Sequence, residues 1–101
     1  MRLNNQYIRA IRQYAKECFG NDSEVYLFGS RVQDNLKGGD IDLLIKTSRP
    51  GKELFDRKMD FLTKLNTTLG FQKIDVIVQQ KYAKKKRDIV IIAENKGEKI
   101  C

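Results

Sequence analysis

Two aspartates that open an apolar stretch, Asp40 and Asp42, are the residues of this 101-residue chain with the clearest capacity for chemistry. They are followed by Leu43, Leu44 and Ile45, a composition that favours a β-strand. Residues two apart on a strand share a face, so the two carboxylates point the same way. Because like charges at this spacing repel each other, the pattern predicts protonation, a basic neighbour or a bound divalent cation.

A third acid, Asp75, lies between Ile74 and Val76 in another apolar stretch that predicts a strand. Acids are rarely buried without a partner or a metal. If this strand pairs with the one that carries Asp40 and Asp42, the carboxylates lie within about 5 Å across the strands. Such oxygen ligands suit Mg²⁺. The chain contains no histidine, which excludes His-based triads and most transition-metal sites.

Three residues that suit phosphate binding precede the acids. Gly29 and Ser30 end an apolar stretch, and nine residues separate Ser30 from Asp40. Glycine lets a phosphate approach the backbone, while serine adds an N–H group and a hydroxyl at the turn. Arg31 adds a guanidinium fork. The Gly-Ser pair is a weak signal by itself, but together with Asp40, Asp42 and the later acid it predicts a metal–nucleotide site.

A structural explanation of the same acids is open as an alternative. In it Asp40 caps a loop, Asp42 pairs with Arg31 or Lys46, and Asp75 pairs with Lys73. This explanation is reasonable for any single acid. It is weaker for three acids beside one Gly-Ser turn, so the metal site is the favoured interpretation.

Apolar periodicity predicts the elements that position these residues. The expected elements are a helix over 5–19 ended by Gly20, strands over 25–28 and 40–46, a helix over 51–69 ended by Gly70, a strand over 73–78, a helix over 82–95 and a short strand over 99–101. Composition alone would also allow a strand over 89–92. The order α-β-β-α-β-α predicts an α/β (α+β) fold, in which a small mixed sheet has helices mainly on one face. We expect one domain, residues 1–101.

In residues 27–31, 40–45 and 74–77 the sequence resembles the minimal nucleotidyltransferase (MNT) family of the polymerase-beta-like nucleotidyltransferase superfamily. The order of helices and strands extends the resemblance over most of the chain. It implies that Gly29 and Ser30 hold a nucleoside triphosphate and that Asp40, Asp42 and Asp75 bind Mg²⁺, as two ions. Asp75 would also help to deprotonate an acceptor hydroxyl, which attacks the α-phosphorus of ATP and releases pyrophosphate.

The resemblance also implies a partner. Many small MNT proteins are antitoxins encoded beside a HEPN ribonuclease toxin, and they adenylylate a tyrosine of that toxin. A protein adenylyltransferase that acts as an antitoxin is therefore the expected function. The alternative is a non-catalytic antitoxin that neutralises its partner by forming a complex. The short chain predicts that the acceptor is carried by the partner and that a homo-oligomer completes part of the surface.

The net charge of +7 and the run Lys84, Lys85, Lys86 and Arg87 indicate either a solvated helix face or a nucleic-acid contact. No recognised nucleic-acid motif accompanies the run, so nucleic acid is not the expected substrate. No apolar run reaches membrane-spanning length and the N-terminus lacks a signal-peptide pattern, so we expect a cytoplasmic protein without membrane contact. Cys18 and Cys101 predict neither a zinc site nor a disulfide.

Overall fold

The computed structural model describes residues 5–28, 40–70, 73–82, 91 and 97–100, with the side chain of Asp40 not described. Its elements are α1 (Asn5–Phe19), β1 (Glu24–Phe28), β2 (Asp40–Thr47), the 3₁₀ turn η2 (Gly51–Glu53), α2 (Leu54–Leu69), β3 (Lys73–Gln80) and β4 (Glu98–Lys99). The first helix and the first three strands lie where the sequence predicts them, to within two residues. The second helix begins with the 3₁₀ turn, which is common at helix N-termini.

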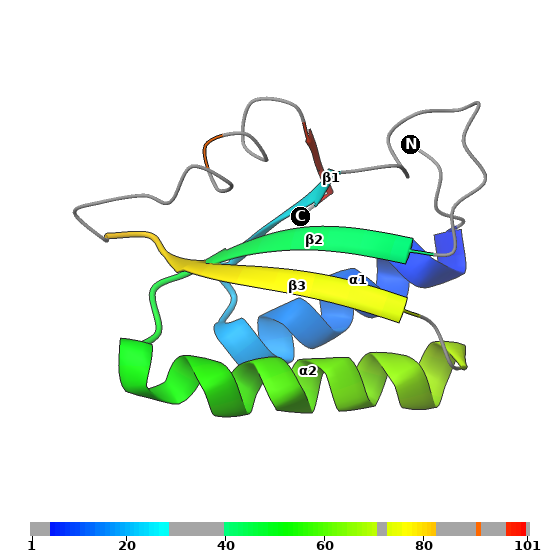
Figure 1. Cartoon of the computed structure of the whole chain (residues 1–101), viewed down its shortest axis with the longest axis horizontal. Helices are drawn as coiled ribbons and strands as arrows, with labels where there is room; N and C mark the ends of the chain where they lie inside the picture. Colours follow the sequence, from blue (N-terminus) through cyan, green and yellow to red (C-terminus); the bar gives the residue numbers. More distant parts are fainter. Residues whose placement is uncertain (1–4, 29–39, 71–72, 83–90, 92–96, 101) are drawn as a thin grey trace.

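The four strands form one mixed sheet in the order β3-β2-β1-β4. Strand β1 runs antiparallel to β2 and to β4, whereas β2 and β3 are parallel. Parallel neighbours need a crossover connection, and here α2 provides it. Both helices lie on the same face of the sheet (Figure 1). The predicted class, a small mixed sheet with helices on one face, is confirmed.

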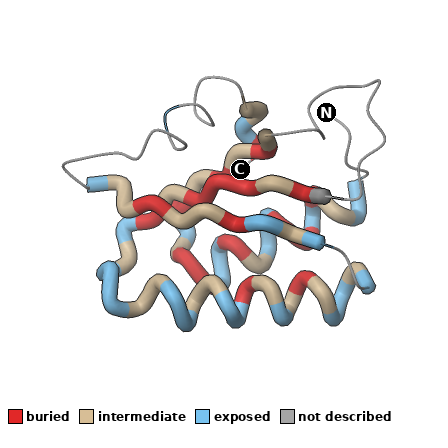
Figure 2. The backbone as a smooth tube through the Cα atoms, viewed as in Figure 1, coloured by how far each residue is buried: buried red, intermediate tan, exposed pale blue. Residues whose placement is uncertain are grey.

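The core lies between the sheet and the two helices. Alternate residues of β2, Ile41, Leu43 and Ile45, are fully buried in it (Figure 2). Phe19 of α1 and Phe61 of α2 pack against each other edge to face, with ring centroids 5.7 Å apart. Burial of apolar surface stabilises such a layer by about 25 cal/mol per Å². The period of two in β2 therefore assigns Asp42 and its alternates to the opposite face.

The opposite face of the sheet has a smaller apolar cluster. Leu44 of β2 is fully buried there, and Tyr26, Phe28 and Ile77 pack against it. These residues come from β1, β2 and β3, so the cluster spans the three long strands. Neither α1 nor α2 covers this face (Figure 1). It is the face on which Asp42 lies, at the edge of the apolar cluster.

Both long helices end at a glycine with a left-handed backbone, as the sequence predicts. Gly20 has φ 105° and donates its N–H to the carbonyl of Lys16, and Gly70 has φ 84° and donates to that of Asn66. Only glycine adopts such angles without strain. Within the described ranges, no helix has the length and apolar character needed to cross a membrane.

The elements predicted for the C-terminal part of the chain can be compared with the structure only in part. Most of the predicted helix over 82–95, including the basic run at 84–87, lies outside the described residues; Tyr82 is in a turn, and Ile91 has helical backbone. The last strand spans Glu98–Lys99 and starts one residue earlier than predicted, because Glu98 pairs with Leu27 of β1. After it, the N–H of Ile100 donates to the carbonyl of Val25 at 2.8 Å.

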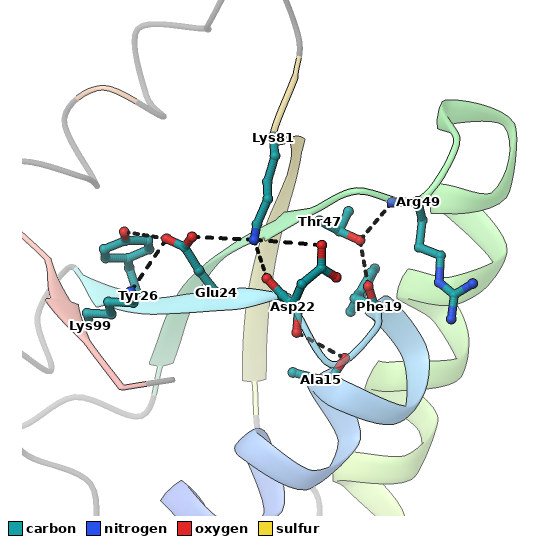
Figure 3. A network of polar contacts seen from close by, with 10 residues as sticks. Ala15, Phe19, Asp22, Glu24, Tyr26, Thr47, Arg49, Lys81 and Lys99 are labelled. Carbon is teal, nitrogen blue, oxygen red and sulfur yellow. Dashed lines mark hydrogen bonds and ion pairs between the residues drawn. The ribbon is translucent and has the colours of Figure 1, made fainter.

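A polar network closes the end of the sheet that lies away from Asp40 (Figure 3). The Lys81 ammonium lies 3.5 Å from Glu24 and 3.8 Å from Asp22, and that of Lys99 lies 3.7 Å from Glu24. The Tyr26 hydroxyl donates to Glu24 at 2.9 Å. Partial burial acts to raise the pKa of Glu24, but the Tyr26 hydrogen bond and the two cations outweigh it and hold this pKa below its usual value. The network joins β1, β4 and the end of β3.

Candidate active site

The parallel pairing of β2 with β3 brings two of the predicted site residues together. Asp42 is the register partner of Asp75, and Asp40 is the register partner of Lys73. Register partners project from the same face, and neighbouring strands lie about 4.8 Å apart. The expectation that Asp75 shares a face with Asp42 on a neighbouring strand is therefore confirmed, whereas the side chain of Asp40 lies outside the described part of the structure.

The exposure of these acids differs from the expectation. Asp42 is half buried, but Asp75 is exposed, so the idea that Asp75 is a buried carboxylate is wrong. The reason is its position: β3 is an edge strand of the sheet, and Asp75 lies on the face that α1 and α2 leave uncovered. The free-energy cost at this site therefore comes from the repulsion between two neighbouring carboxylates, not from the desolvation of a deeply buried one.

The end of β1 also reaches the acids. Phe28, the last residue of β1, is the register partner of Asp42. The residues predicted to hold phosphate, Gly29, Ser30 and Arg31, follow immediately but lie outside the described residues. Three strands thus contribute to one corner of the sheet, and the chain leaves β1 at that corner.

The described carboxylates fit a magnesium site in their chemistry. Mg²⁺ binds hard oxygen ligands and is commonly held by one or two carboxylates together with substrate phosphates. Asp42 and Asp75 supply two such groups from neighbouring strands, and Asp40 precedes Asp42 by two residues in β2, in register with Lys73. Among side chains that the structure describes, no three acids, cysteines or histidines form a metal-binding group. A site built on Asp42 and Asp75 therefore depends on Asp40 or on phosphate oxygens for further ligands.

The buried thiol does not belong to this site. Cys18 lies in the core between the helices and the sheet, and its thiol donates a hydrogen bond to the carboxylate of Asp60 at 3.5 Å. Burial and that hydrogen bond raise the pKa of Cys18 to about 11. The thiolate is the nucleophilic form of cysteine, so the thiol is inert near neutral pH.

Two cavities also lie apart from the acids. One, of about 530 Å³, is next to the first half of α2, and the other, of about 300 Å³, lies between α2 and β3. Neither Asp42 nor Asp75 is among the described residues that line them.

One functional candidate was missed in the sequence. Lys73 is exposed and lies two residues before Asp75 on β3, which places it on the same face as the acids. From the sequence, Lys73 is expected only as a structural partner of Asp75. The signal in the sequence was the spacing of two residues between Lys73 and Asp75. The pairing of Lys73 with Asp40 follows only from the register of β2 and β3.

A family model described as a nucleotidyltransferase domain matches residues 8–100. The chain therefore belongs to the nucleotidyltransferase-domain family, within the polymerase-beta-like superfamily. No curated protein matches the chain. The family establishes a transferase of the nucleotidyltransferase kind, a class that generally uses a nucleoside triphosphate and a divalent metal ion.

Proposed function

We propose that this protein is an Mg²⁺-dependent adenylyltransferase that transfers AMP from ATP to a tyrosine hydroxyl of a HEPN-type ribonuclease toxin, and so acts as an antitoxin. The observation that supports transferase activity is that Asp42 and Asp75 are register partners on neighbouring strands, in a chain of the nucleotidyltransferase family. Asp42 also lies opposite Phe28, the last residue of β1. The toxin partner is supported by the resemblance to small MNT antitoxins.

In this proposal Asp40, Asp42 and Asp75 would hold two Mg²⁺ ions, and the ions would supply positive charge that stabilises the negative charge of the transition state. Gly29, Ser30 and Arg31 bind the phosphates. Asp75 accepts the proton of the acceptor hydroxyl, for which its exposed position is suitable. The bond from the acceptor oxygen to the α-phosphorus forms, the bond from the α-phosphorus to the bridging oxygen breaks, and pyrophosphate leaves.

Transfer of labelled AMP tests the proposal directly. The protein is incubated with α-labelled ATP, Mg²⁺ and the product of the adjacent gene, and label on that product is measured. We expect transfer by the wild type and a loss of about 100-fold or more in Asp42→Asn, because the neutral amide is a much weaker metal ligand. Asp56→Asn on the exposed side of α2 is the matched control and should retain activity.

Two results would refute the transferase. The first is an absence of labelled product with wild-type protein, and the second is an equal rate of transfer in Asp42→Asn. Label on a residue other than tyrosine would refute only the proposed acceptor.

A second candidate function is a binding module that neutralises its partner without catalysis. Two apolar side chains of α2 favour it: Phe55 is 70% exposed and Met59 is 39% exposed. Exposed apolar groups on one helix are typical of a protein-binding surface. Suppression of toxicity by the double variant Asp40→Asn, Asp42→Asn would support this candidate. Loss of suppression while the variant still binds the toxin would exclude it.

A further inference from the structure

We propose that Lys73 is a phosphate-binding residue that contacts the polyphosphate of the bound nucleotide. The inference rests on the proposed transferase function and adds a residue to its site. It is based on the position of Lys73 in the sheet. Lys73 is the register partner of Asp40 on the neighbouring parallel strand, and it lies two residues before Asp75 on its own strand.

The register forms a two-by-two array on the uncovered face of the sheet. Asp40 and Asp42 of β2 lie opposite Lys73 and Asp75 of β3. Alternate residues of a strand are about 6.6 Å apart, and the strands are about 4.8 Å apart. The flexible four-carbon stem of lysine lets its ammonium move over this distance. Lys73 is exposed and occupies the first position of β3.

The charge balance of the site with ATP and Mg²⁺ bound favours a phosphate-binding role for Lys73. Two divalent ions do not neutralise three carboxylates and a triphosphate together, so a further cation stabilises the complex. The proposed reaction also ends in a separate pyrophosphate, which keeps its negative charge after the α-phosphorus has been transferred. A lysine ammonium is a common point-charge partner for phosphate.

Other described lysines have different places. Lys81 and Lys99 form ion pairs at the far end of the sheet, with Asp22 and Glu24 for the first and Glu24 for the second. Lys46 lies opposite Glu24 on β1, near the same end. Among the strand lysines in the described part of the chain, Lys73 is thus the one in register with the acid-bearing start of β2.

Binding measurements with the whole protein separate a phosphate contact from simple neutralisation of the acids. The ligands are a non-hydrolysable ATP analogue with Mg²⁺, inorganic pyrophosphate with Mg²⁺, and Mn²⁺ alone. We expect Lys73→Ala to weaken binding of the ATP analogue and of pyrophosphate by about tenfold or more, because a charge-assisted hydrogen bond is lost. Affinity for Mn²⁺ alone should not fall. Lys73→Arg keeps the positive charge and should restore most of the affinity for both phosphate ligands.

Lys52→Ala is the matched control, because Lys52 is exposed in η2 at the other end of β2 and its loss changes the net charge equally. It should leave both affinities unchanged. The inference is overturned if Lys73→Ala binds the ATP analogue with the same affinity as wild type and binds Mn²⁺ more tightly than wild type. That result would mean that Lys73 only neutralises the acids. If wild type itself binds no nucleotide, both the inference and the proposed function fail. Circular dichroism and thermal melting verify that the variants are folded.

Discussion

At the scale of single residues, Thr47 connects the end of β2 to the end of α1 through one buried hydroxyl. Its Oγ1 donates to the carbonyl of Phe19 at 2.7 Å and accepts the N–H of Arg49 at 3.1 Å. The residue has no exposed surface. The hydroxyl thereby fixes the chain at the point where β2 leaves the sheet.

We expect Thr47→Val to lower the free energy of unfolding by about 1–3 kcal/mol, because a buried carbonyl and a partly buried N–H lose their partner while the side-chain volume stays similar. Urea denaturation measures the change. Thr63→Val is the control: Thr63 is exposed and its hydroxyl donates only to the carbonyl of Met59 in its own helix. That substitution should change the free energy by less than about 0.5 kcal/mol. Equal effects in the two variants would contradict the role given to Thr47.

At the scale of elements, α2 has one face in the core and another in solvent. Phe61 is fully buried against Phe19, whereas Phe55 on the same helix is 70% exposed. Helix α2 also connects β2 to β3, so its packing holds the two strands that carry the acids. The same side-chain type thus occurs in two environments on one element.

We expect Phe61→Ala to lower the free energy of unfolding by about 3–5 kcal/mol, because the ring leaves a cavity in the core. Thermal and denaturant unfolding both report this loss. Phe55→Ala should change stability by less than about 0.5 kcal/mol. A small effect at Phe61 would mean that α2 does not pack on the sheet through this face.

At the scale of the whole molecule, Glu24 brings together charges from distant parts of the chain. Lys81 follows β3 and Lys99 lies in β4, and both form ion pairs with Glu24 at the start of β1. The pKa of Glu24 lies below its usual value in the folded protein. In the unfolded chain these partners are dispersed, so the pKa of Glu24 returns toward the ordinary glutamate value of 4.5.

The sign of the resulting pH dependence follows from this shift. The unfolded state takes up a proton at Glu24 first as the pH falls, so the stabilisation is present above about pH 4.5 and is lost as the pH falls through the folded-state pKa. We expect Glu24→Gln to have a lower Tm than wild type at about pH 7, with the difference shrinking toward about pH 3. Melting curves across this range test it. Asp56→Asn, at an exposed position of α2, is the control. A difference that stays constant with pH would show that the carboxylate charge is not responsible.

Much of the architecture and part of the candidate site could be predicted from local sequence. The helix over 5–19 and its Gly20 end follow from apolar periodicity and from the backbone angle that glycine tolerates. The spacing of Asp40 and Asp42 fixes their common face, because side chains alternate along any strand. These features depend on neighbours within a few residues, so the sequence by itself determined them.

The tertiary structure decided which residues of neighbouring strands lie opposite each other. The order β3-β2-β1-β4 places β3 at the edge, which exposes Asp75, and the register sets Asp42 against Asp75 and Asp40 against Lys73. Alternation assigns a face to each residue but leaves the pairing register open, since shifting a strand by two residues keeps every face unchanged. The crossover from β2 to β3 runs through α2, so this register depends on contacts between segments that are distant in the sequence. Only the folded chain therefore brings Asp40 and Asp42 of β2 into register with Lys73 and Asp75 of β3.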